Sequence, residues 1–271
     1  MKQAIESVLN QNYCNLEYII LDGGSRDSSI KIIQEYNNEI TYWESRSDGG
    51  QAAVINKGWQ MSNGDIFGWL NSDDFYSKKT FETLVKAMVE NPDGEIFIGN
   101  CAATNKSGRI ISIKNTDKYD FNTLLNGRSL GQPSVFIKKR VLQNIGYLNA
   151  NLHWCLDWAF FIKVLYYYRN SNKIIYINKV LSFSREYEGT KTNTGLDRKG
   201  KERRAVLKSY FREWLYINYR RRLQAYAATY IVQALDQYNN GAKFKSFISI
   251  LLGMSISPFF VFNRIMKKIN T

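Results

Sequence analysis

Histidine, proline and cysteine are scarce in this sequence, and their scarcity argues against several classes of protein. The 271 residues contain one histidine, three prolines and three cysteines. A single histidine weakens any histidine-based catalytic triad or zinc site. Cys14, Cys101 and Cys155 are far apart and odd in number. We therefore expect no disulfide framework and no zinc knuckle, and a reducing compartment is favoured. The first eleven residues have a mixed, helical pattern without the continuous apolar region of a signal peptide, so we also expect no secretion signal.

Positive charge, by contrast, is abundant. Thirty-seven Lys and Arg against 24 Asp and Glu give a net charge of +13, and 44% of the residues are hydrophobic. The length suits one large domain, or one domain with a helical extension, with enough apolar residues for a full core. The excess charge indicates an anionic partner, which can be nucleic acid, an anionic membrane surface or a phosphorylated substrate.

Strand-like and helix-like patterns alternate through the first hundred residues. Apolar, β-rich runs predict strands at 16–24, 40–45, 65–71 and 95–100. Helical patterns occur between them at 3–12, 28–36, 51–61 and 78–90. This rhythm predicts an α/β fold with a mostly parallel sheet covered on both faces, which binds ligands at the carboxyl edge of its strands.

Acidic residues follow two of the predicted strands. Asp22 stands at the end of the first strand, and Asp73 and Asp74 follow the third, so we expect these acids to share one crevice. Adjacent carboxylates suit Mg²⁺ or Mn²⁺ bridged to substrate phosphates. The alternative is an ordinary strand-to-helix turn around Asp22 and a solvated turn with a helix-capping acid at Asp73 or Asp74.

Two further segments could carry chemistry. Gly49 and Gly50 precede a predicted helix whose first backbone N–H groups could bind an anion, with Lys57 supplying charge. Asp157 stands among aromatic residues, which would desolvate its carboxylate and suit it to act as a general base. The alternatives are a simple connection at the first segment and a water-exposed carboxylate at a helix start at the second.

Six segments, taken in order, resemble the inverting glycosyltransferase family 2, whose members have the GT-A fold. The resemblance is strongest to the branch that builds bacterial O-antigen, capsule and other surface polysaccharides. The segments are residues 4–13, 16–29, 40–59, 63–76, 131–148 and 152–165. Together they extend over roughly residues 3–192.

The resemblance implies a role for each acid. Asp22, with Gly23 beside it, would contact the uracil or ribose end of a nucleotide-sugar, most often a UDP-sugar. Asp73 and Asp74 would hold the Mn²⁺ or Mg²⁺ that binds the donor's pyrophosphate. Asn71 stands where many members have the first acid of this motif, and it belongs to the donor site. Asp157 matches the catalytic base.

Two departures from the family pattern stand at the ends of the matched region. Arg185 and Lys191 remain candidate phosphate contacts, whereas Tyr187 replaces a histidine between them. Family members also open with an apolar strand before the helix that begins here at Lys2. We therefore expect a misassigned gene start or a truncated gene. If the strand is absent, the alternative is a catalytically impaired relative without donor binding.

The C-terminal part differs from the rest in composition. We predict a glycosyltransferase domain over residues 1–195 and a helical tail over 196–271. Residues 198–222 carry ten basic and two acidic residues with interleaved aromatics. This pattern is typical of a membrane-surface helix, while nucleic-acid binding and a solvated helix face are the alternatives.

The last apolar segment favours the membrane. Residues 246–262 carry no charge, but the segment is short for a span and is interrupted by Pro258. We predict an interfacial or re-entrant hairpin, the alternative being a helix packed on the catalytic domain. With the resemblance, this implies a cytoplasmic enzyme peripheral to the inner face of the plasma membrane, with a saccharide or polyprenyl-linked acceptor. No nucleic-acid partner is expected, and a basic nucleic-acid-binding protein is the remoter alternative.

Overall fold

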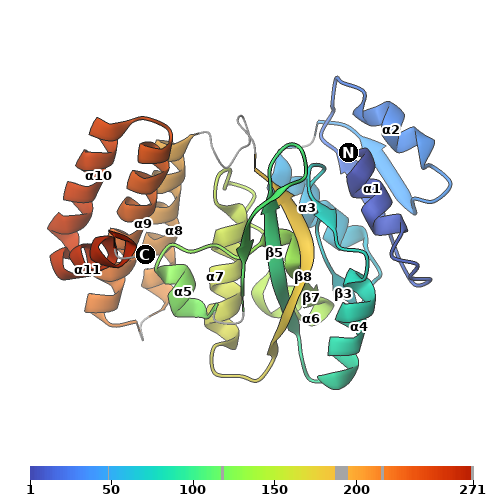
Figure 1. Cartoon of the computed structure of the whole chain (residues 1–271). Helices are drawn as coiled ribbons and strands as arrows, with labels where there is room; N and C mark the ends of the chain where they lie inside the picture. The colour runs from blue at the N-terminus through green and yellow to red at the C-terminus, as the bar shows by residue number, and fades with distance from the viewer. Residues whose placement is uncertain (48, 117–118, 187–194, 215–216, 270–271) are drawn as a thin grey trace. The chain divides into compact units, whose positions relative to one another are not determined.

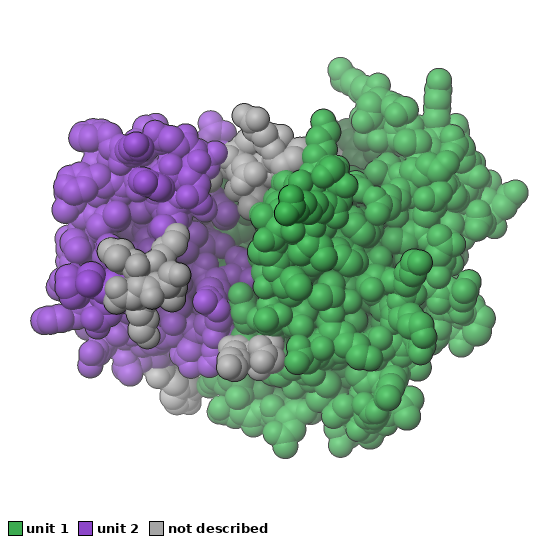
Figure 2. Space-filling view, viewed as in Figure 1, with its two compact units in different colours: residues 1–119, 130–186 green, residues 120–129, 187–271 purple. Residues whose placement is uncertain are grey.

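The computed structural model describes residues 1–47, 49–116, 119–186, 195–214 and 217–269. The chain divides into two compact units, coloured separately in Figure 2. The first unit comprises residues 1–119 and 130–186, and the second comprises residues 120–129 and 187–271.

The first unit is an α/β unit whose helices and strands follow the predicted order. Its helices are α1 (Lys2–Leu9), α2 (Ser29–Glu35), α3 (Gln51–Met61), α4 (Thr80–Glu90), α6 (Lys139–Ile145) and α7 (Leu156–Tyr168), with the 3₁₀ helix η1 (Gln132–Ser134). Its strands are β1 (Ile19–Asp22), β2 (Tyr42–Ser45), β3 (Ile66–Phe67), β4 (Phe75–Tyr76), β5 (Ile96–Thr104), β6 (Ile110–Lys114), β7 (Val135–Lys138) and β8 (Ile174–Arg185).

These strands form two sheets. β1 pairs in parallel with β2, and the other six strands follow the order β3-β7-β5-β8-β4, with β6 also paired to β5. β5 and β8 run in parallel through the middle of the unit (Figure 1), whereas the other pairs of this sheet are antiparallel. The predicted α/β class is confirmed, but the large sheet is mixed and not mostly parallel. Hydrophobic runs locate strands but do not determine their partners.

Helix α1 contributes side chains to the hydrophobic clusters beside both sheets. Ile5 joins a cluster with Ile33 and Ile40 beside β1 and β2. Val8, one turn later, joins the cluster around Phe97 of β5. Burying each of these side chains stabilises the fold by about 1.5–3 kcal/mol. The helix therefore fixes the small sheet against the large one.

The second unit consists of helices. They are α5 (Phe121–Leu125), α8 (Leu196–Glu213), α9 (Tyr219–Asn239), α10 (Lys243–Ile256) and α11 (Pro258–Ile269). The Arg221 guanidinium of α9 donates to the Asn122 carbonyl at 2.9 Å and to Asn126 Oδ1 at 3.0 Å, which fixes α5. Residues 120–129 therefore pack with the C-terminal helices, although the predicted boundary assigned them to the first domain.

The apolar segment 246–262 forms a helix, a break and a second helix. α10 ends at Ile256 and α11 begins at Pro258, the position where proline suits a helix start. Across the described ranges, no helix combines the length and the apolar character that crossing a bilayer requires.

Candidate functional site

Asp22 ends β1 and is surrounded by hydrogen-bond donors. Its side chain is 8% exposed. It accepts from the backbone N–H of Gly24 at 3.1 Å and of Ser25 at 2.8 Å, and from the hydroxyls of Ser25 and of Ser45, its partner on β2, at 2.5 and 2.6 Å. Burial alone would raise the pKa of Asp22, but these hydrogen bonds together hold it below the ordinary value. Asp22 is thus an ionised acid that organises its loop.

The two glycines after Asp22 differ in backbone conformation and in the space around them. Gly24 adopts φ +84°, and a Cβ there would lie 3.2 Å from the Ser47 nitrogen. Gly23 has nothing within 4 Å of its Cβ position, so its backbone is open to a ligand. This arrangement suits the predicted contact between Gly23 and the donor.

The turn after β3 holds a second buried acid. Asp74 is 6% exposed and accepts from Asn71 Nδ2 at 3.1 Å and from the Arg185 backbone N–H at 3.2 Å. Burial, reinforced by the neighbouring charge of Asp73, raises the pKa of Asp74 to about 6. Asp73 itself is half-buried. The turn therefore places one partly exposed carboxylate directly beside a buried one.

Two glutamines complete a network around Asn71. Gln51 Nε2 donates to Asn71 Oδ1 at 3.0 Å, and Asn71 Nδ2 donates to Gln132 Oε1 at 3.1 Å. Gln132 Nε2 in turn donates to the Trp69 carbonyl at 2.6 Å. A Cβ at Gly131 would lie 2.1 Å from the Cβ of Cys101, so only glycine lets this segment approach β5 so closely.

The sequence predictions assigned no role to Gln51 or Gln132. Both lie inside segments that carry the family resemblance, 40–59 and 131–148. Their place in these segments was the only sign in the sequence that the two glutamines belong to the site. Their hydrogen bonds to Asn71 could not be predicted, because they join residues 20 and 61 positions apart. The two glutamines fix the orientation of the Asn71 amide.

Asp157 lies in the first turn of α7 and is half-buried. Phe161, one turn later on the same helix face, stacks on Trp69, with ring centroids 6.0 Å apart and planes 12° apart. Phe160 packs on Trp59, which also contacts Trp69 at 5.4 Å. Trp69 lies two residues before Asn71, at the start of the turn after β3. The stacked rings therefore hold the first turns of α7 against the turn after β3.

Two of the predicted phosphate contacts have partners inside the first unit. Lys57 forms an ion pair with Glu44, so its charge is already balanced, and its role toward a donor stays a prediction. The Arg185 guanidinium contacts the Gln3 side chain and lies 5.3 Å from the centroid of the Phe75 ring. Its Nε is buried and has no hydrogen-bond partner among the described residues. Lys191 lies outside the described residues.

The loop after β1 and the turn after β3 lie at one edge of the first unit. A Cβ at Gly24, in the loop after β1, would lie 3.2 Å from the nitrogen of Ser47, in the loop after β2. Gln51, four residues after Ser47, donates to Asn71 of the turn after β3 at 3.0 Å. This supports the prediction that the two acidic segments lie close together.

The residues of this edge fit a divalent cation held together with phosphates. Within the part of the chain that the structure describes, no three His, Cys, Asp or Glu side chains gather into a closed metal site. Mg²⁺ bound with substrate phosphates needs only one or two protein carboxylates. Asp73 is accessible enough to act as a ligand, and a cation there would stabilise the charge of buried Asp74.

Comparison with known families identifies the family of this chain. Residues 1–146, more than half of the chain, match the family described as Glycosyl transferase family 2. The chain belongs to glycosyltransferase family 2. An uncharacterized glycosyltransferase of Haemophilus influenzae is 31% identical over 189 residues, 68% of this chain and 73% of that protein. One of Rickettsia typhi is 27% identical over 210 residues. The chain spans 63% of the length of this Rickettsia relative.

Solved structures place this family 2 chain among proteins of GT-A-like fold. Staphylococcus aureus TarS 1–349 in complex with UDP-GlcNAc has a TM-score of 0.62 and 14% identity, covering 93% of this chain and 86% of that one. The mannosyltransferase PcManGT of Pyrobaculum calidifontis, in complex with GDP-Man and Mn²⁺, has a TM-score of 0.59 and 12% identity, covering 98% and 75%. At these identities the likeness shows the fold alone.

Proposed function

We propose that this family 2 glycosyltransferase transfers a sugar from a nucleotide-diphosphate donor to a hydroxyl of a saccharide acceptor, with inversion at the anomeric carbon. The observation that carries the proposal is the turn of Asn71, Asp73 and Asp74, which is linked through Gln51 and Ser47 to the Asp22 loop. Structural neighbours in complex with UDP-GlcNAc and GDP-Man support a nucleotide-sugar donor.

The donor's nucleotide and diphosphate bind at different parts of this edge. The open backbone at Gly23, held in place by Asp22, takes the nucleotide end. Asp73 would hold the Mn²⁺ or Mg²⁺ beside the diphosphate, and the cation would supply electrostatic stabilisation of the leaving group. Arg185, whose backbone N–H contacts Asp74, adds positive charge beside them.

Asp157 performs the proton transfer. Its carboxylate accepts the proton of the acceptor hydroxyl while the hydroxyl oxygen forms a bond to the anomeric carbon. The bond between that carbon and the diphosphate oxygen breaks, and its electron pair leaves with the nucleoside diphosphate. Attack on the face opposite the leaving group inverts the anomeric configuration. The stacking of Phe161 on Trp69 holds Asp157 in position for this step.

The proposed pathway is the synthesis of a surface polysaccharide, with a saccharide carried on a polyprenyl lipid as acceptor. Support comes from the six segments that resemble this branch of the family. Binding experiments with different nucleotide-sugars would identify the donor sugar, and UDP-GlcNAc is the first one to test.

Replacement of the base tests this function. Asp157→Asn should lower the transfer rate by about 10²–10⁴-fold, because the acceptor hydroxyl loses its proton acceptor. Calorimetry with UDP-GlcNAc and Mn²⁺ should give wild-type donor affinity for the variant. Asp93→Asn is the matched control, since Asp93 is an exposed acid that precedes β5, at the opposite end of that strand from the site. Loss of donor binding in Asp157→Asn would contradict the assignment of Asp157 as the catalytic base.

A further inference from the structure

Several basic residues of 198–222 hold the second unit together. Arg203 is buried and donates to the Gly127 carbonyl and the Ser129 hydroxyl. Arg222 donates to the carbonyls of Ile217 and Trp214. The Trp214 ring is buried as well. Arg198, Lys201, Lys208, Arg212 and Arg220 are exposed, so the membrane-surface role of this segment stays a prediction. Large exposed apolar side chains gather on α10 and α11.

Helix α10 packs against α9 through its small and polar residues. The Ser246 hydroxyl donates to the Ala234 carbonyl at 2.8 Å, and the Ser249 hydroxyl donates to Gln237 Oε1 at 2.8 Å. One turn further, a Cβ at Gly253 would lie 3.4 Å from the Tyr230 Cβ. Ser246, Ser249 and Gly253 are all buried. Close approach through small residues with hydroxyl hydrogen bonds is typical of helix pairs in lipid.

The opposite face of α10 is apolar and exposed. Phe244 is 76% exposed and Phe247 is 57% exposed. With Ile248, Leu251 and Leu252, all of them exposed, they form what we call the outer face of α10. A helix packed on a core in water has the reverse arrangement, with its apolar stripe inward.

Helix α11 repeats this arrangement. Val261 is buried in the cluster with Ala227 and Ile231 of α9. Phe259, 81% exposed, and Phe262, also exposed, point away from that cluster. Together with Met266, these two residues form the outer face of α11. Covering apolar side chains of this exposure is favourable, so both outer faces would be stabilised by contact with an apolar phase.

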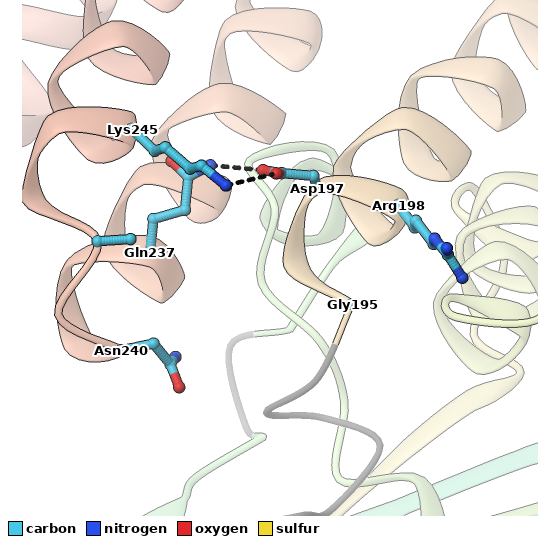
Figure 3. A pocket seen from close by; sticks show the side chains of 7 residues that line it. Gly195, Asp197, Arg198, Gln237, Asn240 and Lys245 are labelled. Carbon is cyan, nitrogen blue, oxygen red and sulfur yellow. Dashed lines mark hydrogen bonds and ion pairs between the residues drawn. The ribbon is translucent and has the colours of Figure 1, made fainter.

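The charges along these helices have one sign. Residues 237–271 contain five basic residues and no acidic one: Lys243, Lys245, Arg264, Lys267 and Lys268. Lys245 stands at the rim of a hollow of about 350 Å³ between α8, α9 and the start of α10. There it faces Asp197 at 3.9 Å, while Gln237 donates to the same carboxylate (Figure 3). The ion pair is long and exposed, so Lys245 stays accessible to an anion.

We propose that the outer faces of α10 and α11 dock this protein on an anionic bilayer surface. The aromatic side chains enter the boundary between headgroups and acyl chains, and Lys243 and Lys245 contact the lipid phosphates. The 14 residues of α10 extend about 21 Å, less than the roughly 30 Å of the hydrocarbon core, so the helix lies along the interface. This inference concerns a surface outside the sugar-transfer site and goes beyond the proposed function.

Co-sedimentation with vesicles tests the inference. The full chain should bind phosphatidylglycerol vesicles more strongly than phosphatidylcholine vesicles, and high salt should weaken the binding. The double variant Phe244→Ser, Phe259→Ser should bind phosphatidylglycerol vesicles at least about tenfold more weakly, since it lacks two exposed aromatic rings that would enter the bilayer. Ile111→Ser is the matched control, because Ile111 is a similarly exposed apolar residue on β6 of the first unit. It should bind like the wild type.

Two outcomes would overturn the inference. One is wild-type binding by the double variant with an unchanged melting temperature, since charge alone would then account for the interaction. The other is a wild-type dimer in sedimentation velocity that the double variant loses, without vesicle binding by either protein, since a second copy would then cover these faces. Donor affinity measured in solution reports on the sugar-transfer site separately, so the two proposals fail independently.

Discussion

Asp22 and Asp74 are both buried acids that follow strands of the first unit, yet their surroundings shift their pKa values in opposite directions. Asp22 accepts hydrogen bonds from two backbone N–H groups and two hydroxyls, and its pKa lies below the ordinary value. Asp74 accepts from Asn71 and the Arg185 N–H only, beside Asp73, and its pKa rises to about 6.

The difference separates two uses of a buried carboxylate. An acid whose oxygens are supplied with donors is stable when ionised and can brace a loop. An acid that is buried with few donors beside a second acid is unstable when ionised until a cation arrives. The Asp22 loop thus has its hydrogen bonds in place without a ligand, whereas the turn at Asp73 and Asp74 would gain stability from a bound cation.

Asp74→Asn should give the largest effect on stability. The rise in the pKa of Asp74 from 3.8 to about 6 means that the wild type loses up to about 3 kcal/mol of stability as pH increases from 4 to 7. The variant has no carboxylate to ionise there, so its free energy of unfolding should fall less over this range and exceed the wild-type value at pH 7. Urea unfolding at several pH values measures both curves; parallel curves would contradict the pKa difference between the two acids.

Asp73→Asn should abolish the cation dependence of donor binding. Without that carboxylate, the affinity for UDP-GlcNAc in Mn²⁺ should fall about 100-fold, toward the affinity measured in chelator, because the metal loses its accessible protein ligand. Calorimetry with and without Mn²⁺ measures this difference. Asp65→Asn is the control, since Asp65 is an exposed acid just before β3 and should leave the affinity unchanged. A variant that keeps the Mn²⁺ effect would place the metal elsewhere.

Ser45→Ala should give the smallest effect, on the other acid. Loss of one hydrogen bond to Asp22 should cost about 1 kcal/mol at neutral pH. Because the hydrogen bonds hold the pKa of Asp22 low, the stability they provide is present above the ordinary pKa and is lost as pH falls. In the variant this pH-dependent loss should be smaller, so the free energies of unfolding of the two proteins should converge as pH falls, which urea unfolding at several pH values measures. Ser47→Ala, at an exposed neighbouring position, should titrate like the wild type.

The sequence predicted the local elements of the first unit better than their pairing. Gly50 before the helical pattern of 51–61 predicted α3 with the bounds that the structure has, since both signals are local. β4 was not predicted, because Phe75 and Tyr76 form a strand only through pairing with Phe183 and Ser182 more than a hundred residues later. Hydrophobic periodicity contains no information about such distant partners.

The same limit applies to the site and the tail. The sequence indicated Asp22 and Asp73 as candidates because acids after strands are a local pattern, whereas the ion pair of Lys57 with Glu44 depends on how α3 packs beside β2. Pro258 correctly marked the break between two helices in the apolar segment. The sequence did not predict that the Ser246 side chain faces inward, because its hydrogen bond is accepted by Ala234 of α9, a distant segment.

The free cysteines give this protein built-in reporters of local opening. Cys14 is exposed, whereas Cys101 lies under the Gly131 turn and Cys155 directly precedes α7. A thiol reagent in water reaches the two buried sulfurs only while their segments are open, so their modification is slower than that of Cys14 by the fraction of time spent open. The reaction rates therefore measure how often the Gln132 turn and the helix that carries Asp157 open in the native protein.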